Sequence, residues 1–468
     1  MATKGSINRG ASFKGFLAST VQTVLLMAVN FVSIPILIKA LGVDSYGVYS
    51  GVLQLAMYVA LLDFGMQVSI PLRYTKFTDQ ADVKSLISSA VKLSLLVSLF
   101  TGVILILFCR DIQAWLIPDS EQNLSVLLLS VGFGAIFQII SRPFLTFYFV
   151  KSSKKEYNIL VFSRSLLVAL LTLFIALVHP TINSLAIVYS LSNLVISGVI
   201  VFYYFWQGNW TVVNNATYFP YLIRKGAILF INSMAVMIIL RSDSIILLKY
   251  VSPSAVTIFA TLFFIPNRLN LILGKLSDFM FPRLSEIYEI SRIEFLKFFE
   301  GMFIFLVGFS VASVIFLHFF LAPFIAFWSG VIVNQTLVDL ILITFLLGTI
   351  IKPLTVVMNI IGRIKFYTVA SVLESVSNIL LSIFLSSEYG ISGVLLGTII
   401  SSFIFSLLPN IYWTLISLKL YSPILKIVIA LCIPILLDGF TSMSLALGGL
   451  LIYLIWRKRN LAINSFSL

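Results

Sequence analysis

Charged residues interrupt the apolar runs of this sequence and are the clearest candidates for chemistry. The basic ones are Lys92, Arg142, Arg164, Arg241, Arg268, Lys275 and Lys352, and the acidic ones are Asp63, Asp243, Asp278 and Glu374. A charge at the centre of a membrane helix costs on the order of 2.5–3.5 kcal/mol, so each should face a wet cavity or a partner. Because the excess is positive, the pattern predicts recognition of an anionic group.

Two of the cations directly precede a proline, in the dipeptides Arg142-Pro143 and Lys352-Pro353. Proline removes a backbone donor and kinks a helix, which can open the backbone toward a cavity and direct the basic side chain into it. We expect these two residues to form a two-sided cationic clamp. The alternative is a structural kink whose basic residue reaches the cytoplasmic headgroups.

The other cations of the second half each have a functional and a structural interpretation. Arg268 and Lys275 are seven residues apart and share a helix face, while Asp278 could pair with Lys275 in a packing face. Arg241 and Asp243 are two residues apart and do not face each other directly. Arg268, Lys275 and Arg241 are therefore candidate substrate-binding residues, and Asp243 and Asp278 are candidate ion-coupling residues.

Three further charges complete the candidate site. Arg164 and Glu374 lie about two turns from the cytoplasmic surface, which leaves substrate contact, snorkelling and mutual pairing open. Asp63 is a lone carboxylate among apolar neighbours. It could exchange protons and couple transport to an ion gradient, or it could be a structural acid beside one of the basic residues. Arg164 joins the predicted binding residues, and Asp63 and Glu374 join the predicted ion-coupling residues.

The elements that must position these residues are membrane-spanning helices. The chain is 60% hydrophobic and 10% charged, whereas soluble domains are about a quarter charged. Apolar runs of about 20 residues can cross a hydrocarbon core of about 30 Å, and they differ from the alternating segments of a membrane barrel. Fourteen spans are predicted near 16–38, 47–72, 86–108, 124–150, 158–178, 184–207, 226–248, 256–281, 298–320, 337–361, 367–385, 391–417, 424–437 and 443–456. The sequence thus predicts an all-α, polytopic membrane protein.

The net charge of +13 reports topology rather than nucleic-acid binding. When alternate loops are assigned to opposite faces, one face receives most of the Lys and Arg residues, including Arg457-Lys458-Arg459 of the tail. The positive-inside rule makes this face cytoplasmic, and both termini lie on it.

An internal repeat relates the two halves at an offset near 210 residues. Arg142-Pro143 matches Lys352-Pro353, Tyr157 matches Tyr367, and Arg164 matches Glu374. An even number of spans separates the copies, so they are parallel repeats, which enclose a substrate site near the midplane and rock in alternating access. We predict a six-helix bundle at 1–207, a cytoplasmic linker at 208–225, a second six-helix bundle at 226–420 and a transmembrane hairpin with a basic tail at 421–468, giving twelve core spans and fourteen in all.

No feature of the sequence indicates a cofactor, a metal site or catalytic residues. Cys109 and Cys432 are far apart, and neither a P-loop nor metal-ligand spacing is present. We therefore expect a protein that is not an enzyme.

Three early segments carry a family resemblance: Asn30-Phe31-Val32-Ser33-Ile34-Pro35, Leu41-Gly42-Val43-Asp44-Ser45-Tyr46-Gly47-Val48-Tyr49 and Leu61-Leu62-Asp63-Phe64-Gly65. They resemble the opening of bacterial polysaccharide exporters of the O-antigen flippase type. Arg241-Ser242-Asp243 and Phe281-Pro282-Arg283-Leu284 resemble the start of that family's second half. The resemblance covers spans 1 to 12, although its motifs are loose and apolar.

The resemblance implies two six-helix bundles of the multidrug and oligosaccharidyl-lipid exporter superfamily in the bacterial inner membrane. Such proteins move undecaprenyl-diphosphate-linked oligosaccharides to the periplasmic leaflet and are thought to be driven by an ion gradient. A polysaccharide polymerase and a chain-length regulator are further candidate partners, besides the lipid bilayer. Phe144, Phe147 and Tyr148 could stack on sugars, although packing toward lipid is the simpler expectation.

Three rival functions remain open. A drug or cation antiporter of the same superfamily would need acids facing its substrate, whereas here the intramembrane charge is mainly basic. A flippase for peptidoglycan precursors would use similar chemistry. A membrane-embedded polymerase or glycosyltransferase would generally need a large external loop or a catalytic cluster, and the predicted loops are short.

Overall fold

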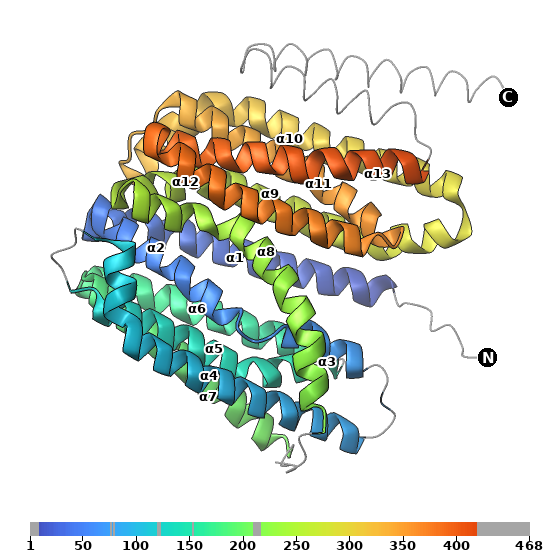
Figure 1. Cartoon of the computed structure of the whole chain (residues 1–468), viewed down its shortest axis with the longest axis horizontal. Coiled ribbons are helices and arrows are strands. Elements are labelled where there is room, and N and C mark those ends of the chain that lie inside the picture. Colours follow the sequence, from blue (N-terminus) through green and yellow to red (C-terminus); the bar gives the residue numbers. More distant parts are fainter. Residues whose placement is uncertain are drawn as a thin grey trace. The chain divides into compact units, whose positions relative to one another are not determined.

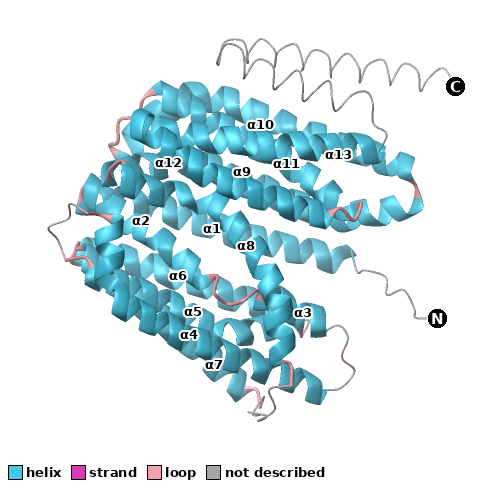
Figure 2. Ribbon diagram, in the orientation of Figure 1, coloured by secondary structure: helices cyan, strands magenta, loops and turns pink. Residues whose placement is uncertain are grey.

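The computed structural model describes residues 9–74, 77, 80–118, 123–151, 154–208 and 217–418. In these ranges every regular element is a helix (Figure 2), and ten helices are long and apolar enough to cross a membrane. The predicted all-α, polytopic membrane fold is thereby confirmed. Spans 13 and 14 lie outside the described residues, as do residues 209–216 of the predicted linker, so the count of fourteen stays a prediction.

The helices follow one another along the chain with short connections (Figure 1). They are α1 (Arg9–Leu41), α2 (Val43–Ala60), α3 (Met66–Tyr74), α4 (Gln80–Leu116), α5 (Ser125–Val150), α6 (Lys154–Val178), α7 (Ile182–Trp206), α8 (Phe219–Tyr250), α9 (Pro253–Ile290), α10 (Arg292–Ser329), α11 (Gln335–Ile360), α12 (Ile364–Ser402) and α13 (Leu408–Leu418), with a π-helical segment at Phe403–Leu407 before α13.

The chain divides into two compact units, Met1–Thr261 and Leu262–Leu468, so that the division falls within α9. Helix α8 packs against α2, α3 and α4 in the first unit. The sequence repeat instead begins its second copy near residue 226, and those bundle boundaries stay a prediction.

The bounds of the helices repeat with the period that the sequence predicts. Ser125 and Gln335 begin α5 and α11, and Val150 and Ile360 end them, an offset of 210 residues at both ends. Helix α12 contains a break at Gly390, where φ is 56°, and this break corresponds to the connection between α6 and α7. The helices that contain Pro143 and Pro353 are each central in their own unit, because α5 packs against α2, α3, α4, α6 and α7, and α11 packs against α10, α12 and α13 (Figure 1).

The predicted span at 47–72 is not a continuous helix, because residues 61–65 separate α2 from α3. Phe64 and Gly65 adopt φ values of 50° and 63°. The Asp63 carboxylate accepts a hydrogen bond from the Gly65 N–H at 2.9 Å, a local bond that competes with helical bonding. The break is therefore encoded by an aspartate and a glycine two residues apart.

Helix α8 contacts this break through its backbone. A Cβ atom on Gly226 would lie 2.1 Å from the carbonyl oxygen of Phe64, closer than atoms can approach. The Phe64 ring stacks on Phe230 of the same helix, with ring centroids 5.5 Å apart. Only glycine at position 226 permits α8 to lie this close to the break.

The aromatic residues that follow Pro143 are buried inside the first unit. Phe144, Phe147 and Tyr148 are at most 7% exposed, and Tyr204 of α7 packs edge-on against both phenylalanines. The expectation that these rings face lipid is wrong, because the side of α5 that carries them packs against α7. They stabilise the helix around the kink instead.

We predict that Gly226→Ala lowers the thermal unfolding midpoint of the detergent-purified protein, because its Cβ atom would overlap the Phe64 carbonyl group. Gly301→Ala in α10 is the matched control, because a Cβ atom there would meet open space. Alanine is a better helix former than glycine, so the control should be neutral or slightly stabilising. Equal midpoints for the two variants would contradict the close contact.

Candidate functional site

The first unit brings Asp63 and Arg142 together as an ion pair. Arg142 Nε lies 3.3 Å from Asp63 Oδ2, and the two side chains are 19% and 4% exposed. Asp63 also accepts a hydrogen bond from Gln67 Nε2 at 3.2 Å. Arg142 Nη2 donates to the carbonyl oxygen of Ala60, the last residue of α2, at 3.5 Å. Both ends of the helix break are thus tied to the residue that precedes the kink in α5.

This pair realises the arrangement expected of a structural acid beside a cation. It also places a carboxylate at the N-terminus of α3, where negative charge is favourable. Arg142 therefore already has a partner in this structure. An anionic ligand that binds it must compete with Asp63.

Arg164 lies in a separate polar network between α5, α6 and α7. Its Nη2 atom donates to Ser141 Oγ at 2.5 Å and to Ser197 Oγ at 3.1 Å. Ser197 Oγ in turn donates to the carbonyl oxygen of Phe137 at 2.7 Å. With the residue only 9% exposed, Arg164 is anchored inside the unit and does not snorkel to the surface.

Arg241 connects α8 to α2. Its Nη1 atom donates to Gln54 Oε1 at 3.1 Å, and one turn along α2 the Tyr58 hydroxyl group donates to the Met237 carbonyl oxygen at 3.4 Å. Ser242, Asp243 and Ser244 follow it and are all buried.

The second unit holds Lys352 against a glycine. A Cβ atom on Gly274 of α9 would lie 1.8 Å from Lys352 Nζ, so the ammonium group occupies the space that a side chain would fill. Lys275 is the next residue of α9 and is half-buried. Arg268, earlier on the same helix, lies over the ring of Phe264 at 5.0 Å. Cations of α9 and α11 therefore belong to one region of this unit.

Glu374 is a buried acid of the second unit, 5% exposed, and it accepts a hydrogen bond from Ser402 Oγ at 2.7 Å. Its repeat-related position is Arg164, and both residues bond to serines in the following helical segment. Each therefore has a partner within its own unit. The side chain of Asp278 lies outside the described residues, so its pairing with Lys275 stays a prediction.

Uncharged residues complete the site, and the sequence analysis missed them. Gln54, Gln67, Ser141 and Ser197 supply the partners of Arg241, Asp63 and Arg164. The spacing of Gln67, one turn after Asp63, was a usable signal. The serine and Gln54 contacts were not accessible from spacing, because they join different helices.

Among the described residues, no group of three or more His, Cys, Asp or Glu side chains could hold a metal ion. The arrangement offers buried and half-buried cationic and amide groups beside proline-containing or broken helices. Such groups can offset the loss of water around an anionic ligand.

Residues 12–288, more than half of the chain, match the family described as "Polysaccharide biosynthesis protein". The chain belongs to this family. A search of curated proteins found no match.

Solved structures show which fold this member of the family has. A structure titled "Lipid II flippase MurJ, inward closed conformation" aligns with a TM-score of 0.70 at 16% identity, covering 95% of this chain and 100% of that one. An inward-facing multidrug resistance MATE transporter of the MOP superfamily aligns with a TM-score of 0.65 at 14% identity, covering 86% and 96%. The MATE multidrug transporter DinF-BH aligns with a TM-score of 0.62 at 15% identity, covering 88% and 96%.

The polysaccharide biosynthesis family member thus has the polytopic fold of MOP-superfamily transporters. These identities are low, so the likeness concerns the fold. The named neighbours are a flippase and transporters.

We predict that Arg142→Gln destabilises the protein by about 3–5 kcal/mol, because it leaves the Asp63 carboxylate buried without its counter-charge. The double variant Asp63→Asn/Arg142→Gln should recover much of this loss, since neither charge remains. Thermal unfolding of the purified protein, followed by fluorescence-detected size exclusion, measures both.

The control is Arg283→Gln, which removes an exposed pair with Glu286 at 3.2 Å. Exposed ion pairs contribute about 0–1 kcal/mol, so this variant should unfold close to the parent temperature. If the double variant loses as much stability as the Asp63→Asn and Arg142→Gln single variants lose together, the two residues act independently.

Proposed function

We propose that the protein is a flippase that moves an undecaprenyl-diphosphate-linked oligosaccharide from the cytoplasmic to the periplasmic leaflet of the bacterial inner membrane. The polymer supplied would be O-antigen or a related surface polysaccharide. The observation that supports this most is the set of buried and half-buried cations on or beside the central proline-containing helix of each unit, in a chain of the polysaccharide biosynthesis family.

The charge of these residues suits a diphosphate. Two phosphate groups leaving the headgroup region lose strong hydration, and guanidinium groups replace it with paired, charge-assisted hydrogen bonds. We assign Arg142, Lys352, Arg268, Arg241, Lys275 and Arg164 to binding the diphosphate and its neighbouring sugars. Arg142 and Lys352 form the two sides of the clamp, and Arg164 supports Arg142 through Ser141.

The ion pair suggests how an ion gradient drives transport. When the diphosphate binds Arg142, Asp63 loses its counter-charge and can bind a proton or another cation. Asp63 releases this cation when its ion pair with Arg142 forms again. Asp63, Asp243, Asp278 and Glu374 are the candidate ion-coupling residues. The excess of buried cations argues against a cationic drug as the substrate, although drug transporters share the fold.

The deciding experiment deletes the gene in its native host and measures surface polysaccharide together with lipid-linked repeat units in isolated membranes. The expected result is loss of surface polymer, with single repeat units accumulating on the cytoplasmic side. Single units that reach the periplasmic leaflet unpolymerised would indicate a polymerase. Unchanged polysaccharide with new drug sensitivity would indicate an antiporter.

We predict that Lys352→Ala fails to restore surface polymer in the deletion strain, because it removes one side of the clamp while opening space beside Gly274. Arg142→Ala should also fail, and Arg164→Ala should be milder, since its serine partners can bond to their own helices. The exposed Lys365→Ala is the matched control and should restore polymer fully. Normal export by both clamp variants, at parental protein levels, would refute the clamp.

Orientation is tested by labelling single cysteines in a chain whose native cysteines are replaced by alanine. Thr336→Cys, before the body of α11, should react with a membrane-impermeant maleimide in intact spheroplasts. Glu289→Cys, at the end of α9, should react only after permeabilisation. The reverse pattern would place both termini and the basic loops on the outer side.

A further inference from the structure

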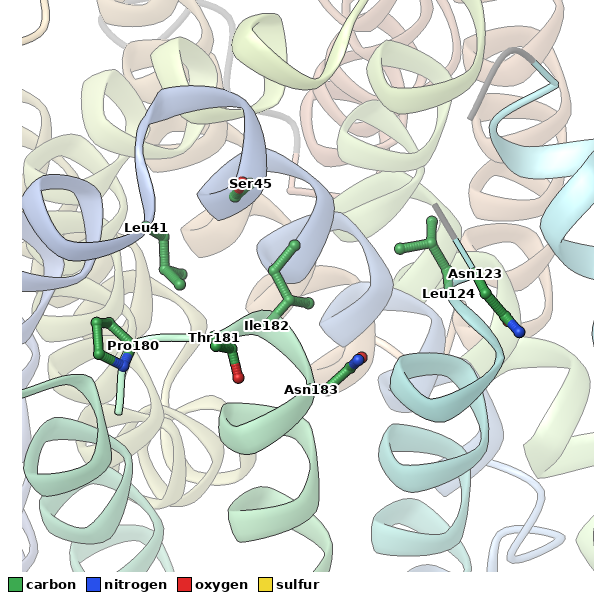
Figure 3. Close-up of a pocket in the computed structure, with 8 residues that line it drawn as sticks. All are labelled: Leu41, Ser45, Asn123, Leu124, Pro180, Thr181, Ile182 and Asn183. Atoms are coloured by element: carbon green, nitrogen blue, oxygen red, sulfur yellow. The ribbon is translucent and has the colours of Figure 1, made fainter. Parts of the chain in front are cut away.

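A pocket of about 410 Å³ lies in the first unit where three chain turns meet (Figure 3). Leu41 and Ser45 come from the corner between α1 and α2, Asn123 precedes α5, and Thr181 and Asn183 come from the turn between α6 and α7. This volume is within the range of about 300–1,000 Å³ that is usual for small-ligand sites. None of the proposed diphosphate-binding residues lines it.

Two polar side chains in the pocket have unused hydrogen-bonding capacity. Within the part of the chain that the structure describes, neither the Ser45 hydroxyl group nor the Asn183 carboxamide bonds to another residue. Asn123 uses its Oδ1 atom to accept the Ser125 N–H at 3.0 Å, so its NH₂ group remains as a donor. Thr181, in contrast, is engaged with Ser184, whose hydroxyl group lies 2.6 Å away.

The backbone around the pocket adds further donors. Ser45 and Asn183 lie in the first turns of α2 and α7, where N–H groups have no partner within the helix. In α7 the Ser184 N–H is capped by Thr181, at 3.2 Å, which leaves the two preceding N–H groups without this cap. The pocket therefore combines hydroxyl and carboxamide groups that can donate and accept, and it lies beside the N-termini of two helices.

The remaining walls are apolar, and the lining carries no formal charge. Leu41, Pro180 and Ile182 supply aliphatic surface beside these polar groups. None of the lining residues is basic, so the lining offers no counter-charge to an anionic ligand. A neutral sugar matches such a lining, because its hydroxyl groups need donors and acceptors and its C–H faces pack against aliphatic side chains.

We propose that this pocket binds a neutral hexose or N-acetylhexosamine unit of the exported glycan. The inference rests on the proposed function for its substrate class. Under the predicted orientation, the α1–α2, α4–α5 and α6–α7 turns face the periplasm, so the pocket would hold a sugar at the exit side, away from the diphosphate. The pocket would thereby recognise the glycan independently of the lipid carrier.

Saturation-transfer NMR on the full-length protein in nanodiscs tests this with free glucose, galactose and N-acetylglucosamine, and with glucuronate as the anionic comparison. Each sugar is supplied at about 10 mM, which populates sites with millimolar Kd. The test variants are Asn183→Leu and Ser45→Val. Their controls, Asn359→Leu and Ser387→Val, make the same changes at exposed positions of the second unit.

The expected result is transfer to at least one neutral sugar, weakened about fivefold or more in each pocket variant and unchanged in the controls. Transfer to no neutral sugar, transfer that persists in both pocket variants, or a preference for glucuronate would overturn the proposal. Because free sugars are bound without any translocation, this result is separate from the deletion experiment. A negative result in the sugar-binding experiment leaves the deletion experiment valid, and a negative result in the deletion experiment leaves the sugar-binding experiment valid.

Discussion

The cost of placing charge inside a bilayer is the constraint that governs this protein's interior. Its clearest expression is the pair between Asp63 and Arg142, which joins the break between α2 and α3 to the kink in α5. Burial of either charge alone would cost free energy, and the carboxylate and the guanidinium neutralise one another there. The irregular backbone at residues 61–65 is tolerated because the Asp63 carboxylate accepts the Gly65 N–H, and that carboxylate is itself satisfied by Gln67 and Arg142.

The same constraint explains why the other buried charges have small or amide-bearing neighbours. Arg164 is held by two serines, Arg241 by a glutamine and Glu374 by a serine, while Gly274 makes room for Lys352. Serine and glycine let helices approach closely, and serine adds a hydrogen bond without bulk. Packing and charge compensation are thus achieved by the same residues.

For the proposed transport function, cations placed in this way have partners that can be exchanged. A partner that is neutral, or that can itself be neutralised, can yield to an anionic substrate at a lower cost than a permanent ion pair could. The internal repeat gives each unit one central kinked helix that presents such a cation. The two units then offer similar chemistry in different surroundings, an acid beside Arg142 and the space left by Gly274 for Lys352.

The all-helical membrane class, the period of the repeat, the prolines inside α5 and α11 and the identity of the intramembrane charges could all be predicted from the amino-acid sequence. These features follow from local properties, namely helix periodicity, transfer cost and proline geometry. The partners of the charges required the folded chain, as Arg241 and Gln54 show at a separation of 187 residues. So did the burial of Phe144 and its neighbours, and the division of the chain within α9. The physical reason is that a hydrogen bond depends on distances of about 3 Å between atoms of different helices, which packing sets and local spacing does not contain.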